Sequence, residues 1–191
     1  MGITLPLDKI CLRSGILCAS CQRKVDEGVI SREELSVLKA LAEVEAGLKD
    51  FEGRYVRAIR YGGNLVILLE ASTRIPRRLR KELASRLKDY GQILVARYGR
   101  DPEETINSLI EPSRIIGADE IYTPDGSRYK VLKIDKKDQH TVAKIEEALK
   151  EIARKIYGVE ILIEYVASKE RKPKISMEKR DIRSSLEKLG L

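Results

Sequence analysis

The sequence predicts an α+β protein built from two similar units in tandem, and three observations lead to this prediction. Segments with helical periodicity and segments with strand-like alternation follow in the order helix, strand, strand, helix, strand, and this order occurs twice. Matching segments of the two halves are about 62 to 70 residues apart in the sequence, which indicates a duplication. An apolar content of 42% is enough for a hydrophobic core.

The predicted organisation has four parts. A cap that contains all three cysteines precedes the first unit, and a basic tail with a short helix follows the second unit. Each unit is expected to form a three-stranded sheet with helices on one face. The predicted ranges are 1–29 for the cap, 30–99 and 100–166 for the two αββαβ units, and 167–191 for the tail.

The first unit opens with the most strongly marked helix, over residues 30–50. Ser31 suits the N-cap position, and Glu34 three residues later completes a capping box. Residues 54–71 then read as a hairpin, because two apolar runs flank the turn residues Gly62, Gly63 and Asn64.

A basic amphipathic helix and a strand complete this unit over residues 74–98. Pro76 suits the first helical position, Leu79, Leu83 and Leu87 form an apolar stripe, and Gly91 is expected to end the helix. The other faces carry six cations in twelve residues: Arg77, Arg78, Arg80, Lys81, Arg86 and Lys88. Such a helix lying on a sheet presents one cationic face, which is typical of a phosphate-binding surface.

The second unit repeats this order. Asp101 and Pro102 open a short helix, and the turn at residues 124–126 joins two strands. A longer helix is expected to begin at His140 or Thr141 and to end at Gly158. The remaining strands are expected at residues 114–122, 127–134 and 159–166.

The charge balance favours an anionic partner. The net charge is +7 and the isoelectric point is about 9.3, which suits RNA, DNA or an acidic protein surface. Charged residues make up 35% of the chain while Asn and Gln are scarce, a bias that resembles thermophile proteins. A solvated surface of a heat-tolerant protein is therefore the alternative reading of the basic helix.

The sequence also indicates where the protein works. No apolar run approaches the roughly 20 residues that a membrane helix needs. Asp8, Lys9 and Arg13 place charges inside the one N-terminal stretch that resembles a signal peptide. We therefore expect a cytoplasmic protein without a membrane partner.

The cysteines Cys11, Cys18 and Cys21 have the spacing C-x6-C-x2-C. The C-x2-C part matches half of a zinc knuckle, because a two-residue gap lets both thiolates reach one tetrahedral ion. A fourth ligand would come from His140, Asp8, Asp26 or a partner. A disulfide, or small buried thiols in a compact cap, are the alternatives. The odd number of thiols favours zinc over a disulfide, and nothing here favours redox catalysis.

The doubled element order resembles that of type II KH domains, in which helices lie between the second and third strands. Residues 30–166 resemble the tandem KH arrangement of NusA-like archaeal transcription factors. The Cys-containing opening followed by Ser-Arg-Glu-Glu-Leu at residues 31–35 is similar to an archaeal group related to transcription elongation factors.

This resemblance implies RNA binding by a non-enzymatic factor that acts in transcription elongation or termination, or on structured RNA. A KH domain clamps nucleotide backbones with a GXXG loop, which this chain lacks. The matching places, residues 72–76 and 135–139, carry cations instead. The residues expected to contact nucleic acid are Arg74, Arg77, Arg78, Arg80, Lys81, Lys88, Lys136 and Lys137.

The competing hypothesis is an adaptor that docks its KH-like units on RNA polymerase or the ribosome. Enzyme functions are disfavoured, because the sequence has no P-loop, nucleophile elbow, zinc-protease or dinucleotide-binding motif. We therefore expect no catalytic residues.

Overall fold

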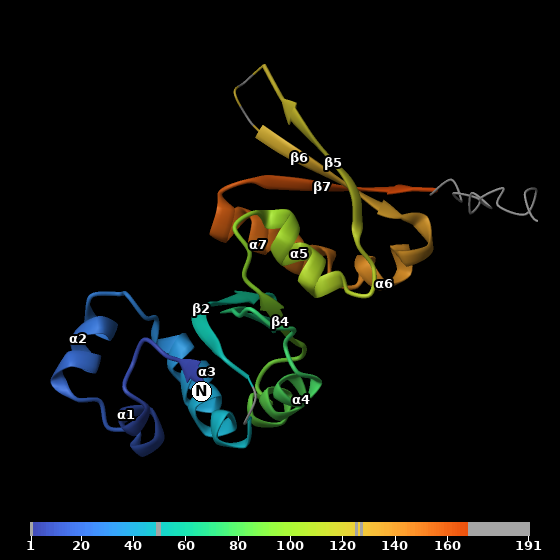
Figure 1. Cartoon of the computed structure of the whole chain (residues 1–191). Coiled ribbons are helices and arrows are strands. Elements are labelled where there is room, and N and C mark those ends of the chain that lie inside the picture. Colours follow the sequence, from blue (N-terminus) through green and yellow to red (C-terminus); the bar gives the residue numbers. More distant parts are fainter. Residues whose placement is uncertain (1, 49–50, 125, 127, 168–191) are drawn as a thin grey trace, which may run out of the picture.

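The computed structural model describes residues 2–48, 51–124, 126 and 128–167 of the chain. Within these ranges the protein is a mixed α+β structure with two separate sheets (Figure 1). One sheet has the strand order β1-β2-β3-β4 and the other has the order β5-β6-β7. The helix predicted in the tail lies outside the described residues.

The cap and the first unit form the first sheet and the helices on one of its faces. The predicted order of helix, hairpin, helix and strand is present, but the sheet has four strands instead of three. The additional strand β1 comes from the cap and pairs in parallel with β2. The elements are β1 Ile3–Thr4, α1 Lys9–Ser14, α2 Ala19–Asp26, α3 Arg32–Val44, β2 Gly53–Tyr61, β3 Asn64–Glu70, α4 Arg77–Arg86 and β4 Ile93–Arg97, with a 3-10 turn at Glu45–Gly47.

The second unit has the predicted order but a divided second helix. The backbone at Ile145 has φ −119° and ψ 8°, outside the helical region, and its side chain is buried in the core of this unit. Gly158 ends the last helical turn with φ 64°, as predicted. The elements are α5 Pro102–Ile110, β5 Ile115–Tyr122, β6 Arg128–Asp135, η2 Lys136–Asp138, α6 Gln139–Ala143, α7 Glu146–Ile152, the π-helical turn η3 Ala153–Tyr157 and β7 Glu160–Val166.

The same strand pairing occurs in both units. β2 and β3 are antiparallel while β3 and β4 are parallel, and β5, β6 and β7 pair in the same way. Each parallel pair is joined by a helical crossover, as parallel strands require. The duplication predicted from element order is thus matched by pairing directions.

Helix α3 begins as the sequence predicts. The Glu34 backbone N–H donates to the Ser31 hydroxyl (3.2 Å), and the Ser31 N–H donates to the Glu34 carboxylate (2.9 Å). This capping box satisfies two free donors at the helix start. The helix then buries one face through Val37, Leu38 and Leu41.

Helix α4 differs from the prediction at both ends. Pro76 is the N-cap instead of the first helical residue, and the helix ends at Arg86 instead of near Gly91. Gly91 has a tertiary role, because its N–H donates to the Gly63 carbonyl (2.9 Å) beside the Asn64 side chain. A Cβ at position 91 would lie 3.1 Å from that side chain, so glycine permits this close approach.

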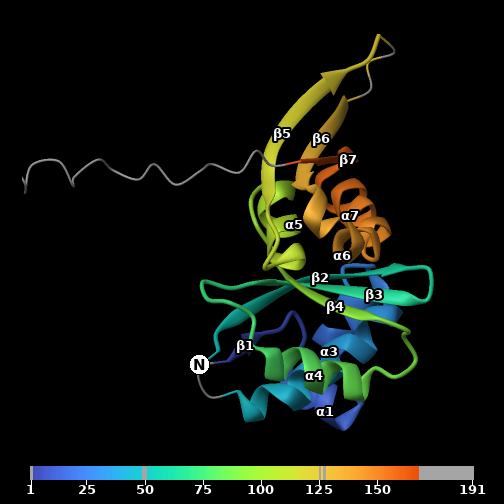
Figure 2. The same cartoon turned by 90° about the vertical axis from the view of Figure 1, so that its right-hand side faces the viewer.

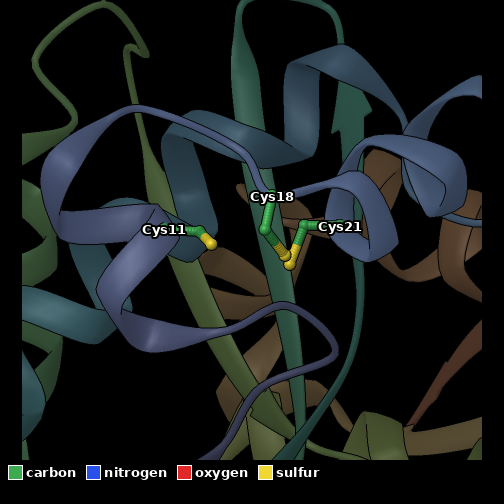
Figure 3. A group of neighbouring side chains, drawn as sticks. All are labelled: Cys11, Cys18 and Cys21. Carbon is green, nitrogen blue, oxygen red and sulfur yellow. The ribbon is translucent and has the colours of Figure 1, made fainter.

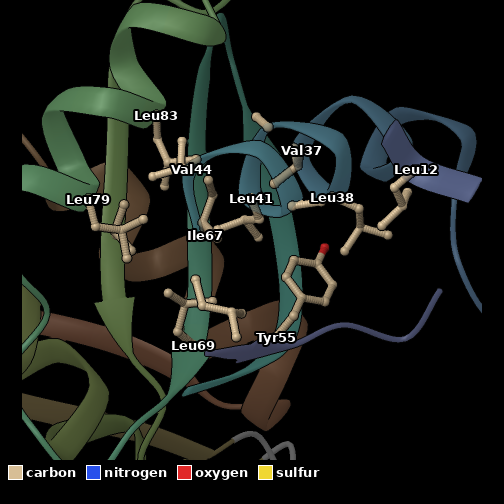
Figure 4. Close-up of a cluster of buried hydrophobic side chains, with 14 of the residues drawn as sticks. Leu12, Val37, Leu38, Leu41, Val44, Tyr55, Ile67, Leu69, Leu79 and Leu83 are labelled. Atoms are coloured by element: carbon tan, nitrogen blue, oxygen red, sulfur yellow. The ribbon is translucent and has the colours of Figure 1, made fainter. Parts of the chain in front are cut away.

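The helices and sheets alternate in layers (Figures 1 and 2). Helices α3 and α4 cover one face of the first sheet, and their buried side chains form the largest core cluster together with β3 (Figure 4). Helices α5, α6 and α7 lie between the two sheets. All three pack on β6 and β7 through one cluster, and α5 and α7 also pack on the first sheet through another.

Strand β3 is therefore covered on both faces. Leu65, Ile67 and Leu69 belong to the cluster with α3 and α4, whereas Val66 and Leu68 belong to the cluster with α7. A strand buried on both sides reads as a continuous apolar run, and the sequence LVILL in β3 has this character.

A polar network joins the two units beside this contact. The Tyr157 and Thr105 hydroxyls lie 2.6 Å apart, and the Tyr157 hydroxyl also donates to the Gly99 carbonyl (2.7 Å). The Tyr157 ring is stacked on Tyr98, with 6.0 Å between centroids. These contacts tie the last helical turn of the second unit to the end of β4.

The part of the chain that the structure describes contains no helix both long enough and apolar enough to cross a membrane.

Candidate metal centre and candidate nucleic-acid interface

The cap brings the three cysteines together (Figure 3). Cys11 lies on α1, Cys18 is the N-cap of α2, and Cys21 lies in the first turn of α2. Gly15 reverses the chain after α1 with φ 77°, which lets α2 turn back toward α1. The three sulfur atoms all lie within 4.8 Å of one another.

The surroundings of the cluster support thiolate ligands. Cys11 and Cys21 are buried while Cys18 is exposed. The Asp8 backbone N–H donates to the Cys21 sulfur at 3.3 Å. Amide donors of this kind hold a ligating sulfur in place and stabilise its negative charge.

The thiols differ in acidity. A hydrogen bond from the Cys21 backbone N–H, with further bonds from the Cys21 and Cys11 thiols, lowers the pKa of Cys18. The Cys18 backbone N–H favours the Cys11 thiolate, but burial and the thiols of Cys18 and Cys21 outweigh it, so the pKa of Cys11 is raised. The exposed Cys18 is thus the readier of these two thiols to ionise.

All three cysteines are free, so the disulfide alternative is wrong for this structure. Among the described residues no histidine, aspartate or glutamate joins the group, so His140, Asp8 and Asp26 do not supply a fourth ligand here. The three sulfurs form a set that could hold one metal ion with a position left for a further ligand.

The predicted nucleic-acid residues fall into two groups. Arg77, Arg78 and Lys81 are exposed on successive positions of one side of α4, with Glu82 as the nearest acid on the helix. Lys88 is exposed just beyond the helix, and Arg74 is exposed just before it. Arg80 differs, because its side chain is partly buried and its Nε is fully enclosed.

Lys136 and Lys137 are exposed on η2, at the end of β6 in the second unit. They therefore lie in a different element and unit from the residues around α4. The Lys137 backbone N–H donates to the Asp135 carboxylate (3.0 Å), which fixes the start of this turn.

One cationic residue near α4 was not among the residues that the sequence predicts to contact nucleic acid. Arg97 ends β4 and lines a cavity together with Arg74 and Arg80. In the sequence, Arg97 is a cation at the end of an otherwise apolar strand. This pattern alone does not show which helix packs beside that end of the strand.

Comparisons with known proteins identify no family. No protein-family model matches the chain, and no curated protein matches it. A solved crystal structure, that of APE1850, is similar at 22% sequence identity and a TM-score of 0.46. The similarity covers 58% of this chain and 86% of that chain.

Proposed function

We propose that the protein is a non-enzymatic RNA-binding factor and that the exposed cationic side of α4 contacts the RNA backbone. The observation that carries this proposal is the position of Arg77, Arg78 and Lys81, which point a concentrated positive charge away from the core. Arginine and lysine side chains contact phosphate oxygens without reading sequence. A net charge of +7 adds long-range attraction for such a polyanion.

The element order supports a likeness to type II KH domains. Each unit combines an antiparallel pair, a helical crossover and a parallel third strand. The second unit has two helices in its crossover, whereas the first has α4 alone. With cations in place of a GXXG loop, we propose backbone contacts instead of base-specific readout, in a factor of the NusA-like type.

The test replaces Arg77, Arg78 and Lys81 by glutamate in the full chain. We expect binding of single-stranded RNA to be lost while the melting temperature stays close to that of the unmodified protein, because these side chains are exposed. A matched control changes Arg23, Arg32 and Lys39, which are exposed on α2 and α3, to glutamate. Equal losses in both variants would show that net charge, not α4, governs binding.

Salt dependence separates this proposal from the adaptor hypothesis. Affinity for single-stranded RNA should fall with a slope of about −0.7 per neutralised phosphate in a plot of log affinity against log salt. If no RNA is retained at low salt, the RNA proposal fails. A protein partner such as RNA polymerase or the ribosome would then be the better explanation of the charge.

We further propose that Cys11, Cys18 and Cys21 bind one zinc ion. The supporting observations are the sulfur positions within 4.8 Å and the amide donor on Cys21. Zinc prefers thiolate ligands in a tetrahedral set, and a water or a partner's side chain would complete it. The bound ion would fasten α1 to α2 in the cap.

A further inference from the structure

A cavity of about 190 Å³ lies where the two units meet beside α4. Its walls come from the start of α4, the end of β4 and the C-terminal part of α5. The residues that matter for its chemistry are Arg74, Arg80, Arg97, Asn107, Ser108 and Glu111.

The charges around this cavity do not balance. The residues that line it include three arginines, from the α4 region and β4, and a single acidic residue, Glu111. Glu111 pairs with Arg74 at 3.1 Å, where the Arg74 side chain is mostly exposed and the Glu111 side chain is exposed in part. In the described part of the chain, neither Arg80 nor Arg97 has a carboxylate partner, so an excess positive charge remains.

The partly buried position of Arg80 lowers the stability of the fold. Its Nε is buried and has no hydrogen-bond acceptor among the described residues. Burial and the nearby charges of Arg74 and Arg77 lower the pKa of its guanidinium, and the charge of Glu111 offsets them only in part. A partly buried guanidinium without an ion pair costs stability, and an anion in the cavity would supply the opposite charge.

The backbone around Arg97 is fixed. The Arg97 N–H donates to the Ser108 hydroxyl (2.9 Å), and the Ser108 hydroxyl lies 3.2 Å from the Arg97 carbonyl. The side-chain Oδ1 of Asn107 accepts a hydrogen bond from the Ile115 N–H (2.8 Å). The β4–α5 side of the cavity is thus held in place before any ligand arrives, which lowers the entropy cost of binding.

We infer that this cavity binds one phosphate group, held between Arg80 and Arg97. Arginine suits this role because its planar fork matches phosphate oxygens in pairs. The source of the phosphate rests on the proposed function, under which it is a backbone phosphodiester of RNA. The site would then anchor the strand between the two units, next to the exposed cations of α4.

The first experiment uses inorganic phosphate and the full chain. In NMR spectra of arginine side chains, the Nε–H signal of Arg80 should shift and saturate as phosphate is added. Arg97→Met should weaken this binding by about tenfold, because one charged hydrogen-bonding pair is lost. Glu111→Gln should tighten it several-fold, because the one opposing carboxylate loses its charge. A signal that does not saturate, or that is unchanged in both variants, would overturn the inference.

The second experiment uses single-stranded RNA and identifies the source. Arg80→Met and Arg97→Met should each reduce RNA affinity by about tenfold and lower the salt slope by about 0.7. Arg23→Met, which removes the same charge from the cap, should change neither. If RNA binds normally to both variants and Arg80 does not respond to phosphate, this site is wrong while the RNA proposal stands. If phosphate saturates Arg80 but no RNA binds, the site stands and the RNA proposal fails.

Discussion

Glu34 is a buried carboxylate that links the start of α3 to β2. Its side chain accepts hydrogen bonds from the Tyr55 hydroxyl (2.6 Å), the Ala58 N–H (3.2 Å) and the Ser31 N–H (2.9 Å). Burial alone would raise the pKa of Glu34, but these bonds outweigh burial and lower it. Burial, together with the hydrogen bond to Glu34, raises the pKa of Tyr55 far above its usual range. The folded state therefore favours an ionised Glu34 beside a neutral Tyr55, and this pair stabilises the fold.

We predict that Glu34→Gln lowers the free energy of unfolding at pH 7 by roughly 1–3 kcal/mol, because charged acceptors are lost from buried donors. A carboxyl with a lowered folded-state pKa stabilises the fold above about pH 4.3 and stops doing so as the pH falls through its folded-state pKa. The difference between the two proteins should therefore shrink in acid.

Urea unfolding at pH 7 and at several values below pH 4.3 measures this prediction. Glu33→Gln is the control, since the neighbouring Glu33 is exposed and lies 3.7 Å from Arg60 in a surface ion pair. A difference that stays constant with pH would show that the ionised carboxylate is not the source of the stability.

The cysteines give a second prediction at this scale. Protein purified without chelator should contain about one zinc per chain, and Cys18→Ser with Cys21→Ser should lose it. Removal of the metal from the unmodified chain should lower the melting temperature, because α1 and α2 would lose the ion that both bind. Elemental analysis and thermal unfolding measure both effects. Ser20→Ala is the control on the same helix, and an equal metal content in all proteins would contradict the site.

Helix α4 separates a structural side from a proposed binding side. Leu79 and Leu83 are fully buried against the first sheet and α3, while Arg77, Arg78 and Lys81 are exposed. Arg86 lies between the two sides and reaches Glu43 on α3 at 3.2 Å. The two sides can thus be changed independently.

We predict that Leu83→Ala lowers the free energy of unfolding by about 2–5 kcal/mol, since it leaves a cavity in a packed cluster. Ser85→Ala on the exposed side should change it by less than about 0.5 kcal/mol. Urea unfolding of both variants measures the contrast. Similar values for both would mean that α4 is not packed on the sheet as the structure describes.

Helices, strands and turns are predicted from the sequence where neighbouring residues alone mark their boundaries. The capping box of Ser31 and Glu34 marks the start of α3, and the glycines at residues 62–63 mark the β2–β3 turn. The end of α4 was predicted wrongly because Gly91 serves a contact with Gly63, a reason that no local pattern contains. The two-residue strand β1 was missed because it exists only through its pairing with β2.

The candidate sites follow the same rule. The cysteine cluster comes from one short segment, so its spacing was enough to predict it. The arginine cavity combines residues from α4, β4 and α5, and whether Arg97 and Arg80 line the same cavity depends on how these elements pack. Sequence periodicity identified the cations of α4 but not Arg97 on β4, which lines the same cavity.

On the scale of the whole molecule, the two units depend on each other. The first sheet buries Ile59, Tyr61, Val66, Leu68 and Ala96 in the cluster with Ala148 and Ile152 of α7. Without the second unit this apolar face of the sheet would contact water. Exposed apolar patches of this kind promote association.

We predict that a fragment of residues 1–100 self-associates, whereas the full chain does not associate through this face. Size-exclusion chromatography with light scattering measures the difference. Val66→Thr together with Leu68→Lys should reduce association of the fragment, because both side chains face the lost partner. A monomeric fragment with the stability of the full chain would contradict the shared core.

The burial of β3 on both faces also bears on which side chains each of the two sheets tolerates. In β3 the five residues from Leu65 to Leu69 are all buried, whereas β6 at the matching place carries lysines at positions 130 and 133. A polar side chain in the middle of β3 would therefore be buried in one of two apolar clusters, whereas β6 keeps lysine side chains in partial contact with solvent. The stacking of the two units thus restricts the side chains that the first sheet tolerates more than those of the second.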